Sequence, residues 1–312
     1  MPFTNSTAAQ YGLLAMHAMD MHRTQPDALT PDPAPGLTAA GWTIVAYVNG
    51  KDVLFANGPL QLGDRTTYYG FLARRGGGEF VAVIRGTDGL IEWIEDGRFL
   101  LVPYAPQLTL PSGQGPVSVE QGFWGIYASL ALTTPAGASL GPVGPAIARA
   151  IGAGGTLTVV GHSLGAALAT YLALDLARGA LAGRMTACLF ASPHTGDTAF
   201  VTLFDQTVVG YRLFNYLLDL VPRLPAGLGY EPLPRRTVIR PETAEARVRF
   251  DVGCNHHVVC YCAMLDYEGT IKAITPVPSG EEGSAACILG SETGLPSVAK
   301  LIAAGLVNVV PV

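Results

Sequence analysis

The chain has 312 residues, of which 49% are hydrophobic and 14% are charged, and its formal net charge is −5. This composition is enough for a large core and includes no basic cluster, so we expect no nucleic-acid partner. No run of about 20 apolar residues occurs, so no transmembrane segment is expected. The first residues do not form a secretory signal, which leaves two options open: a cytoplasmic protein, or a secreted one whose signal has been removed.

The N-terminal part of the chain predicts one helix and several strands. Apolar residues at helical spacing predict a helix that ends near Arg23, with Asn5 or Ser6 as its N-cap. Two strands are then predicted to pair around Asn49-Gly50, a typical hairpin dipeptide. These two strands are 42–48 and 53–57. Three glycines at 76–78 read as a turn between two further strands.

Beyond these glycines, strand-like and helical runs alternate. The apolar strand-like runs are 79–85, 157–160, 185–191 and 211–215, and the helical runs are 120–132, 143–151, 166–174 and 257–266. Such alternation predicts a mostly parallel central sheet with helices on both faces. We find no composition shift that marks a domain boundary. We therefore expect a single α/β domain over residues 1–312.

The pentapeptide G-H-S-L-G at 161–165 is the most informative motif. It follows an apolar run and precedes an alanine-rich helix, so Ser163 stands at the tip of a strand–turn–helix junction. Gly161 and Gly165 lack Cβ atoms, which lets strand and helix cross closely and makes a strained turn tolerable. This arrangement predicts a nucleophile elbow at the edge of an α/β-hydrolase sheet. The N–H of Leu164, at the helix start, is placed to stabilise an oxyanion.

The serine needs a general base, and the base needs an orienting carboxylate. In α/β-hydrolases these residues follow the serine in the order acid, then histidine. His256 and His257 are the histidines that lie well downstream of Ser163 with acids between. Among those acids, Asp219 closely follows an apolar strand-like run, where α/β active sites gather. We therefore predict Asp219 as the acid and leave the histidine open at this step.

Four further segments occur in a fixed order around the elbow. They are VIRGT at 83–87, LIEWIED at 90–96, ASPHTGD at 191–197 and DLVPRLP at 219–225. Together with the elbow, they resemble the motifs of class 3 lipases, the family of filamentous-fungal triacylglycerol lipases. The resemblance implies that Ser163 is the nucleophile and Asp219 the triad acid. It also implies that Thr87 and the N–H of Leu164 form the oxyanion hole.

The same resemblance bears on the choice of histidine. Residues 255–261, N-H-H-V-V-C-Y, resemble the family segment H-x-[LV]-x-x-Y when His256 is the base. His257 would have the wrong spacing to Tyr261. We therefore predict His256 as the general base and keep His257 as the alternative.

The segment 88–101 resembles the family's lid. Its apolar side chains include Leu90, Ile91, Trp93 and Ile94, which we predict to contact substrate. A short apolar helix over the cleft would exclude water and open on transient contact with a lipid interface. The alternative is a surface helix that packs on the core. A lid implies a water-insoluble acyl ester as substrate, and a plain helix is equally compatible with a short-chain or aryl ester.

The five cysteines are an odd number, so at least one is unpaired. Cys188 lies in an apolar run and is predicted to be a buried thiol. The other four allow up to two disulfides in three pairings; they are Cys254, Cys260, Cys262 and Cys287. Three of these, with His256 and His257, have the side chains that zinc prefers, but the spacing lacks the usual pairs. We expect no metal and no other cofactor.

The combined pattern predicts a serine hydrolase that cleaves carboxylic esters of acylglycerols, as a triacylglycerol lipase, through an acyl-enzyme. The main alternative is a carboxylesterase that needs no interface. An acyltransferase with the same acyl-enzyme and a non-catalytic binding protein are further alternatives. Degenerate hydrolases usually lose the nucleophile or the base, and this chain keeps candidates for both, which argues against the last.

Overall fold

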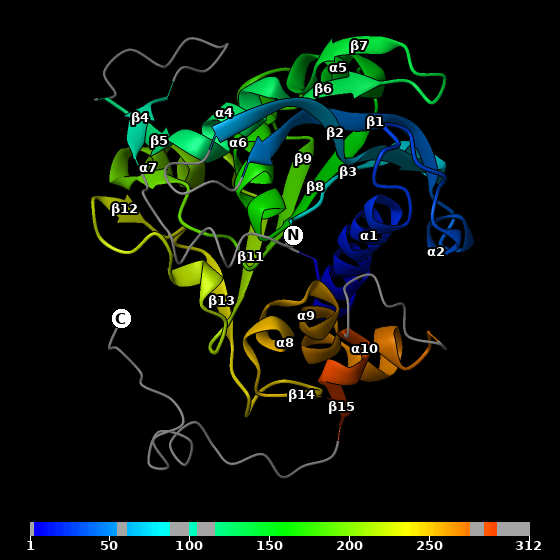
Figure 1. Ribbon diagram of the computed structural model, residues 1–312, viewed down its shortest axis with the longest axis vertical. Helices are drawn as coiled ribbons and strands as arrows, with labels where there is room; N and C mark the ends of the chain where they lie inside the picture. Colours follow the sequence, from blue (N-terminus) through cyan, green and yellow to red (C-terminus); the bar gives the residue numbers. More distant parts are fainter. Residues whose placement is uncertain (1–2, 55–60, 88–99, 105–115, 275–283, 292–312) are drawn as a thin grey trace.

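The computed structural model describes residues 3–54, 61–87, 100–104, 116–274 and 284–291 (Figure 1). Within them, a nine-stranded sheet has the order β13-β11-β9-β8-β3-β2-β1-β6-β7. Its strands are β1 (Thr43–Leu54), β2 (Gln61–Arg75), β3 (Glu79–Ile84), β6 (Ala131–Thr133), β7 (Ser139–Pro142), β8 (Thr156–His162), β9 (Met185–Phe190), β11 (Tyr211–Tyr216) and β13 (Arg236–Ile239). Neighbours from β3 to β13 are parallel, and neighbours from β3 to β7 are antiparallel. The predicted α/β architecture with helices on both faces is confirmed. The sheet is mixed and not mostly parallel as predicted, because β2, β1, β6 and β7 extend it by antiparallel pairing.

The two faces of the sheet bury different sets of helices. Along β3, Val81 and Val83 belong to one core cluster, whereas Ala82 and Ile84 belong to the other. This period of two is what a strand covered on both faces requires. One face packs against α1 (Asn5–Thr24), α2 (Pro35–Ala39), α8 (Val252–His256), α9 (Val258–Leu265) and α10 (Ser284–Cys287), and the other against α4 (Gln121–Ser129), α5 (Val143–Ile151), α6 (Leu164–Arg178) and α7 (Thr198–Thr207). Figure 1 shows α1 and the group α8–α10 side by side.

Smaller elements complete the described part of the chain. A four-stranded sheet has the order β12-β10-β5-β4, and β14 pairs with β15. Their bounds are β4 (Leu101–Pro103), β5 (Ser118–Glu120), β10 (Gly196–Asp197), β12 (Tyr230–Glu231), β14 (Arg247–Val248) and β15 (Ile288–Gly290), and the short helical turns are η1 (Gly76–Gly78), η2 (Val221–Arg223) and η3 (Tyr267–Ile271). As predicted, the three glycines of η1 connect two strands, β2 and β3. No helix in the described segments combines the length and apolarity needed to cross a bilayer.

The N-terminal helix is confirmed, but its cap differs from the prediction. The N-cap is Thr4, whose Oγ1 accepts the N–H of Thr7 at 3.1 Å. Asn5 and Ser6 are already helical. The three consecutive residues 4–6 all have side chains that suit an N-cap, so composition alone does not select among them.

The predicted hairpin at Asn49-Gly50 is wrong. β1 continues through this dipeptide and pairs with β2, with a register shift between Val48 and Asn49 and with Gly50 opposite Thr67. A side chain at Gly50 would place its Cβ 2.6 Å from Leu130, so the glycine serves close packing against the end of α4. Asn49 donates its Nδ2–H to Thr133 of β6 at 3.0 Å. Contacts distant in sequence therefore override a strong local turn signal.

Candidate active site

Ser163 occupies a strained junction between β8 and α6. Its φ of 59° and ψ of −131° lie outside the regions that a serine normally adopts. A Cβ at Gly161 would lie 2.3 Å from the carbonyl oxygen of Gly165, and one at Gly165 would lie 2.3 Å from that of Ile84. Both positions therefore require glycine, because the atoms in the way are backbone. The crossing of β8, α6 and the end of β3 forces the serine outward, as a nucleophile elbow requires.

His256 connects Ser163 to Asp219. Its Nε2 lies 2.7 Å from Ser163 Oγ, and its Nδ1 lies 2.9 Å from Asp219 Oδ2. An ionised carboxylate only accepts hydrogen bonds, so Nδ1 carries the proton and Nε2 is left to accept the serine hydroxyl. All three residues are at least 92% buried. The structure thus brings together the three residues predicted for the triad.

His257 stands outside this arrangement. It forms the break between α8 and α9, with φ −57° and ψ 131°. Its Nε2 lies towards the first turn of α8, 3.6 Å from where a Cβ of Gly253 would be. His256, and not its neighbour, is the histidine in contact with Ser163 and Asp219.

Asp219 is held by a network that extends beyond the histidine. Its Oδ1 accepts the N–H of Val221 at 3.0 Å, and its Oδ2 accepts the hydroxyl of Tyr261 at 2.7 Å. Tyr261 in turn accepts the N–H of Tyr216, the last residue of β11, at 2.8 Å. Burial and the neighbouring carboxylate raise the pKa of Tyr261 well above its ordinary value, so the phenol remains a donor. The sequence did not predict this contact of Tyr261; the spacing between His256 and Tyr261 is the signal that indicates it.

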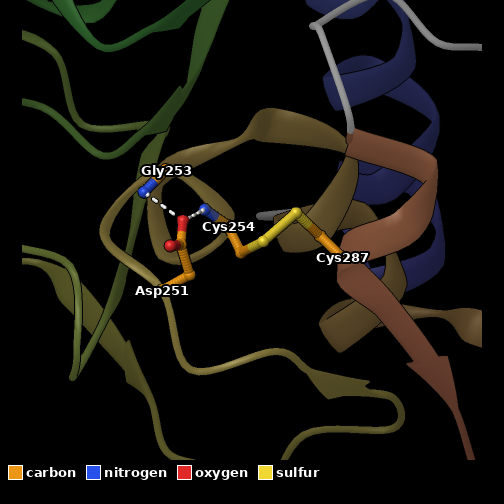
Figure 2. Close-up of a disulfide and its surroundings, with 4 residues drawn as sticks. All are labelled: Asp251, Gly253, Cys254 and Cys287. Carbon is orange, nitrogen blue, oxygen red and sulfur yellow. Dashed lines mark hydrogen bonds between the residues drawn. A yellow bond between two sulfur atoms is a disulfide. The ribbon is translucent and has the colours of Figure 1, made fainter.

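The helix that carries His256 is short and fixed from several sides. Asp251 caps α8 by accepting the N–H groups of Gly253 and Cys254 at 2.9 and 3.2 Å, as Figure 2 shows. A disulfide joins Cys254 to Cys287 at the end of α10. Asn255 donates its Nδ2–H to the carbonyl of Leu218 at 3.2 Å, in the loop before the acid. These contacts compensate for the low stability of an isolated five-residue helix.

The cysteines follow one of the patterns that the sequence left open. A single disulfide forms among the described residues, and Cys188, Cys260 and Cys262 are buried and take no part in it. The buried position of Cys188 was predicted. The zinc alternative loses Cys254 to the disulfide and His256 to the contacts with Ser163 and Asp219. No group of three or more His, Cys, Asp or Glu within the described ranges is arranged to hold a metal ion.

The two residues predicted to stabilise an oxyanion lie beside the elbow. Leu164 is the first residue of α6, so its N–H has no partner inside the helix. Thr87 follows Gly86, where an added Cβ would lie 3.1 Å from Ser163 Cβ. The end of β3 therefore reaches the nucleophile. The predicted lid residues Leu90, Ile91, Trp93 and Ile94 lie outside the described residues.

The fold and this serine–histidine–aspartate geometry are those of the α/β-hydrolases. Residues 81–228 match the family model named "Lipase (class 3)". This match confirms the resemblance to class 3 lipases that the motifs predicted.

Sequence relatives include plant phospholipases. The chain is 31% identical to phospholipase A1-II 3 of Oryza sativa subsp. japonica over 196 residues, which cover 58% of this chain and 44% of the relative. It is 32% identical to phospholipase A1-IIgamma of Arabidopsis thaliana over 169 residues, which cover 49% of this chain and 39% of the relative. The chain thus spans under half the length of these relatives.

Solved structures with the same fold include fungal lipases. The triacylglyceride lipase of Rhizomucor miehei matches with a TM-score of 0.53 and 23% identity, over 74% of this chain and 78% of that one. Lipase II from Rhizopus niveus matches with a TM-score of 0.53 and 18% identity, over 76% and 82%. At these identities the likeness concerns the fold, and it confirms the α/β-hydrolase class.

Proposed function

We propose that the protein is a serine-type carboxylic ester hydrolase that cleaves the acyl esters of glycerolipids with Ser163, His256 and Asp219. The observation that carries this proposal is the continuous contact from Ser163 Oγ through both ring nitrogens of His256 to Asp219. Such a chain gives the serine hydroxyl a base and gives the base a fixed tautomer, which are the two requirements for an active nucleophile.

In the proposed mechanism, Ser163 attacks the ester carbonyl while His256 takes the hydroxyl proton. The proton then passes to the leaving alcohol, which departs as the acyl-enzyme forms. Water activated by His256 releases the fatty acid and restores the serine. Asp219 stabilises the imidazolium that forms in each half of the cycle.

The oxyanion of each tetrahedral intermediate is assigned to Thr87 and to the N–H of Leu164. The support is positional: Leu164 begins the helix that follows the nucleophile, and Gly86 packs against Ser163. Loss of one such donor typically lowers kcat by about 10²–10³-fold.

We propose triacylglycerol as the first substrate class. Leu220 directly follows Asp219 in the chain and is 50% exposed, and Leu100, within the predicted lid segment, is 51% exposed. Exposed leucines next to a hydrolytic site favour a water-insoluble substrate. The segment 88–101 stays a predicted lid, with transient contact at a lipid surface. A phospholipid acyl ester is the second candidate, because the plant relatives are called phospholipase A1.

The test compares wild type with Ser163→Ala on p-nitrophenyl esters from C2 to C16, emulsified triacylglycerol and phosphatidylcholine vesicles. We expect Ser163→Ala to fold normally and to lose about 10⁴–10⁶-fold in kcat on the best substrate. Retained activity in Ser163→Ala would contradict the assignment. Serine-dependent activity confined to short esters would instead define a carboxylesterase, and acyl transfer to an added alcohol in dilute solution would define an acyltransferase.

A further inference from the structure

His162, the residue directly before the nucleophile, reaches across to the segment that carries the base. It is the last residue of β8 and is 2% exposed. Its Nε2 lies 2.7 Å from the backbone carbonyl oxygen of His256, and the two imidazole rings have centroids 4.7 Å apart, tilted by 38°. We infer that His162 is a positioning residue for the general base, an inference that rests on the proposed function.

The alternation of side chains along β8 explains why His162 points to this side. Thr158 contacts Tyr11 of α1, and Val160 belongs to the core cluster that includes α1 and α9. His162 continues the same series with a period of two, so it emerges on the face where α8 and α9 pack. Ser163 stands one residue later, where the strand has ended. The end of β8 thus positions Ser163 as the nucleophile and directs the ring of His162 towards the backbone of His256.

The contact also fixes which nitrogen of His162 carries a proton. A carbonyl oxygen only accepts, so Nε2 of His162 must donate. Nδ1 of the same ring lies 3.5 Å from where a Cβ of Gly86 would be, at the end of β3. The ring therefore lies between the backbone that leads to Thr87 and the backbone of His256.

The carbonyl of His256 needs this donor because of where α8 ends. His256 is the last residue of α8, and the chain turns at His257 before α9 begins. The last carbonyls of a helix have no partner inside the helix, and a buried carbonyl left unpaired is costly. His162 supplies the partner at the residue whose ring touches Ser163. A backbone shift of about 1 Å at a base can cost about 10²-fold in rate.

The test compares His162→Phe, which keeps a ring and loses the donor, with His162→Gln, whose side-chain N–H₂ can reach the same carbonyl. On a soluble p-nitrophenyl ester we expect His162→Phe to lower kcat by about 10–100-fold with KM within twofold of wild type. His162→Gln should recover kcat to within about fivefold of wild type. Thermal unfolding of both variants shows whether the difference in kcat between them reflects the hydrogen-bond donor or a difference in stability.

Ser163→Ala in the same assay separates the two proposals. If Ser163→Ala remains active, the proposed function fails. If activity depends on Ser163 but His162→Phe has wild-type kcat, or His162→Gln is as impaired as His162→Phe, the inference about His162 is wrong. A measurement on the wild-type protein needs no variant to fold: ¹⁵N NMR of the histidine rings should show His162 protonated at Nε2. A His162 ring that carries its proton only on Nδ1 would overturn the inference.

Discussion

The two sides of the candidate triad are built in different ways. The serine side is a junction of regular elements: β8, α6 and the end of β3 cross so closely that Gly161 and Gly165 leave no room for a Cβ atom. The histidine side is a five-residue helix outside the sheet. It is held by the Asp251 cap, by a disulfide and by side-chain hydrogen bonds to the neighbouring loop and strand.

This difference shows that one active site can combine two kinds of rigidity. Backbone crowding at the elbow fixes Ser163 and leaves no room for an added side-chain atom. Even a glycine-to-alanine substitution there is therefore expected to lower the free energy of unfolding strongly. The base is fixed by several separate contacts, and the loss of one of them costs about 1–3 kcal/mol. Removal of a single contact should therefore weaken the site only partly. Substitutions on each side therefore test whether the serine and the histidine are held in these two different ways.

The largest effect is expected at the base itself. His256→Ala should lower kcat by about 10⁴–10⁶-fold, because both contacts that link Ser163 to Asp219 pass through its ring. His257→Ala, its matched neighbour, should change kcat by less than tenfold. Steady-state kinetics on one soluble ester measures both. The reverse pattern would move the base by one residue and contradict the triad.

Gly165→Ala tests the crowding of the elbow. Its Cβ would lie 2.3 and 2.4 Å from the backbone oxygens of Ile84 and Arg85, so we expect a loss of more than about 4 kcal/mol in the free energy of unfolding. Gly144→Ala in α5 is the control, because its Cβ would lie 3.8 Å from the hydroxyl oxygen of Tyr127, an ordinary van der Waals distance. That change should alter the free energy of unfolding by less than about 1 kcal/mol, because the gain in helix propensity is opposed by the proline that follows. Urea denaturation measures both, and equal stability of the two variants would show that the elbow is not crowded.

The elbow could be predicted from the sequence because the residues that constrain it are close together in the chain. Two glycines, one serine, an apolar run before and alanines after all lie within about 20 residues, and each has a steric reason to be there. The alternation of strands and helices in the parallel half of the sheet could be predicted for the same reason. The motif at 83–87 added the one distant element, the end of β3.

The histidine side was only partly readable because its contacts are far apart in the chain. Cys254 and Cys287 are 33 residues apart, and sequence offered three pairings. The contact of Tyr261 with Asp219 spans 42 residues. The hairpin prediction at Gly50 failed for the same reason, since Gly50 packs against Leu130, which is distant in the sequence. Local patterns predict local geometry, and contacts across the fold decide the rest.

Removal of the disulfide should produce the next largest effect, on both stability and kcat. For a loop of 33 residues, the chain-entropy model gives a loss of about 3–4 kcal/mol in unfolding free energy for Cys254→Ala with Cys287→Ala. We expect kcat to fall as well, since Cys254 lies two residues before His256. Calorimetry and kinetics on the double variant measure both effects. As a control, Cys188→Ala removes a buried thiol within β9 and should lower stability without a matching loss of kcat. A double variant within about 1 kcal/mol of wild type would show that hydrogen bonds alone hold α8.

Tyr261→Phe should give the smallest effect on catalysis. It removes one of the hydrogen bonds to Asp219 and leaves the N–H of Tyr216 without its acceptor, while His256 and Val221 keep their bonds to the carboxylate. We expect a loss of about 1–3 kcal/mol in stability and about 3–10-fold in kcat. Because the pKa of Tyr261 is raised well above its ordinary value, its hydroxyl stays protonated, and the loss in kcat should be constant from about pH 6 to pH 9.

Tyr127→Phe is the matched control for that variant. Tyr127 is also a buried phenol that donates to a carboxylate, that of Asp175 on α6, and burial likewise raises its pKa well above the ordinary value. Its loss should lower stability by a similar amount and leave kcat unchanged, because Asp175 bonds Tyr104 and Tyr127 near the C-terminal end of α6, whereas Ser163 precedes the N-terminal end. If both variants lose the same kcat, the phenol at Tyr261 acts through general stability. If only Tyr261→Phe loses kcat, the orientation of Asp219 is one of the graded contacts that hold the histidine side.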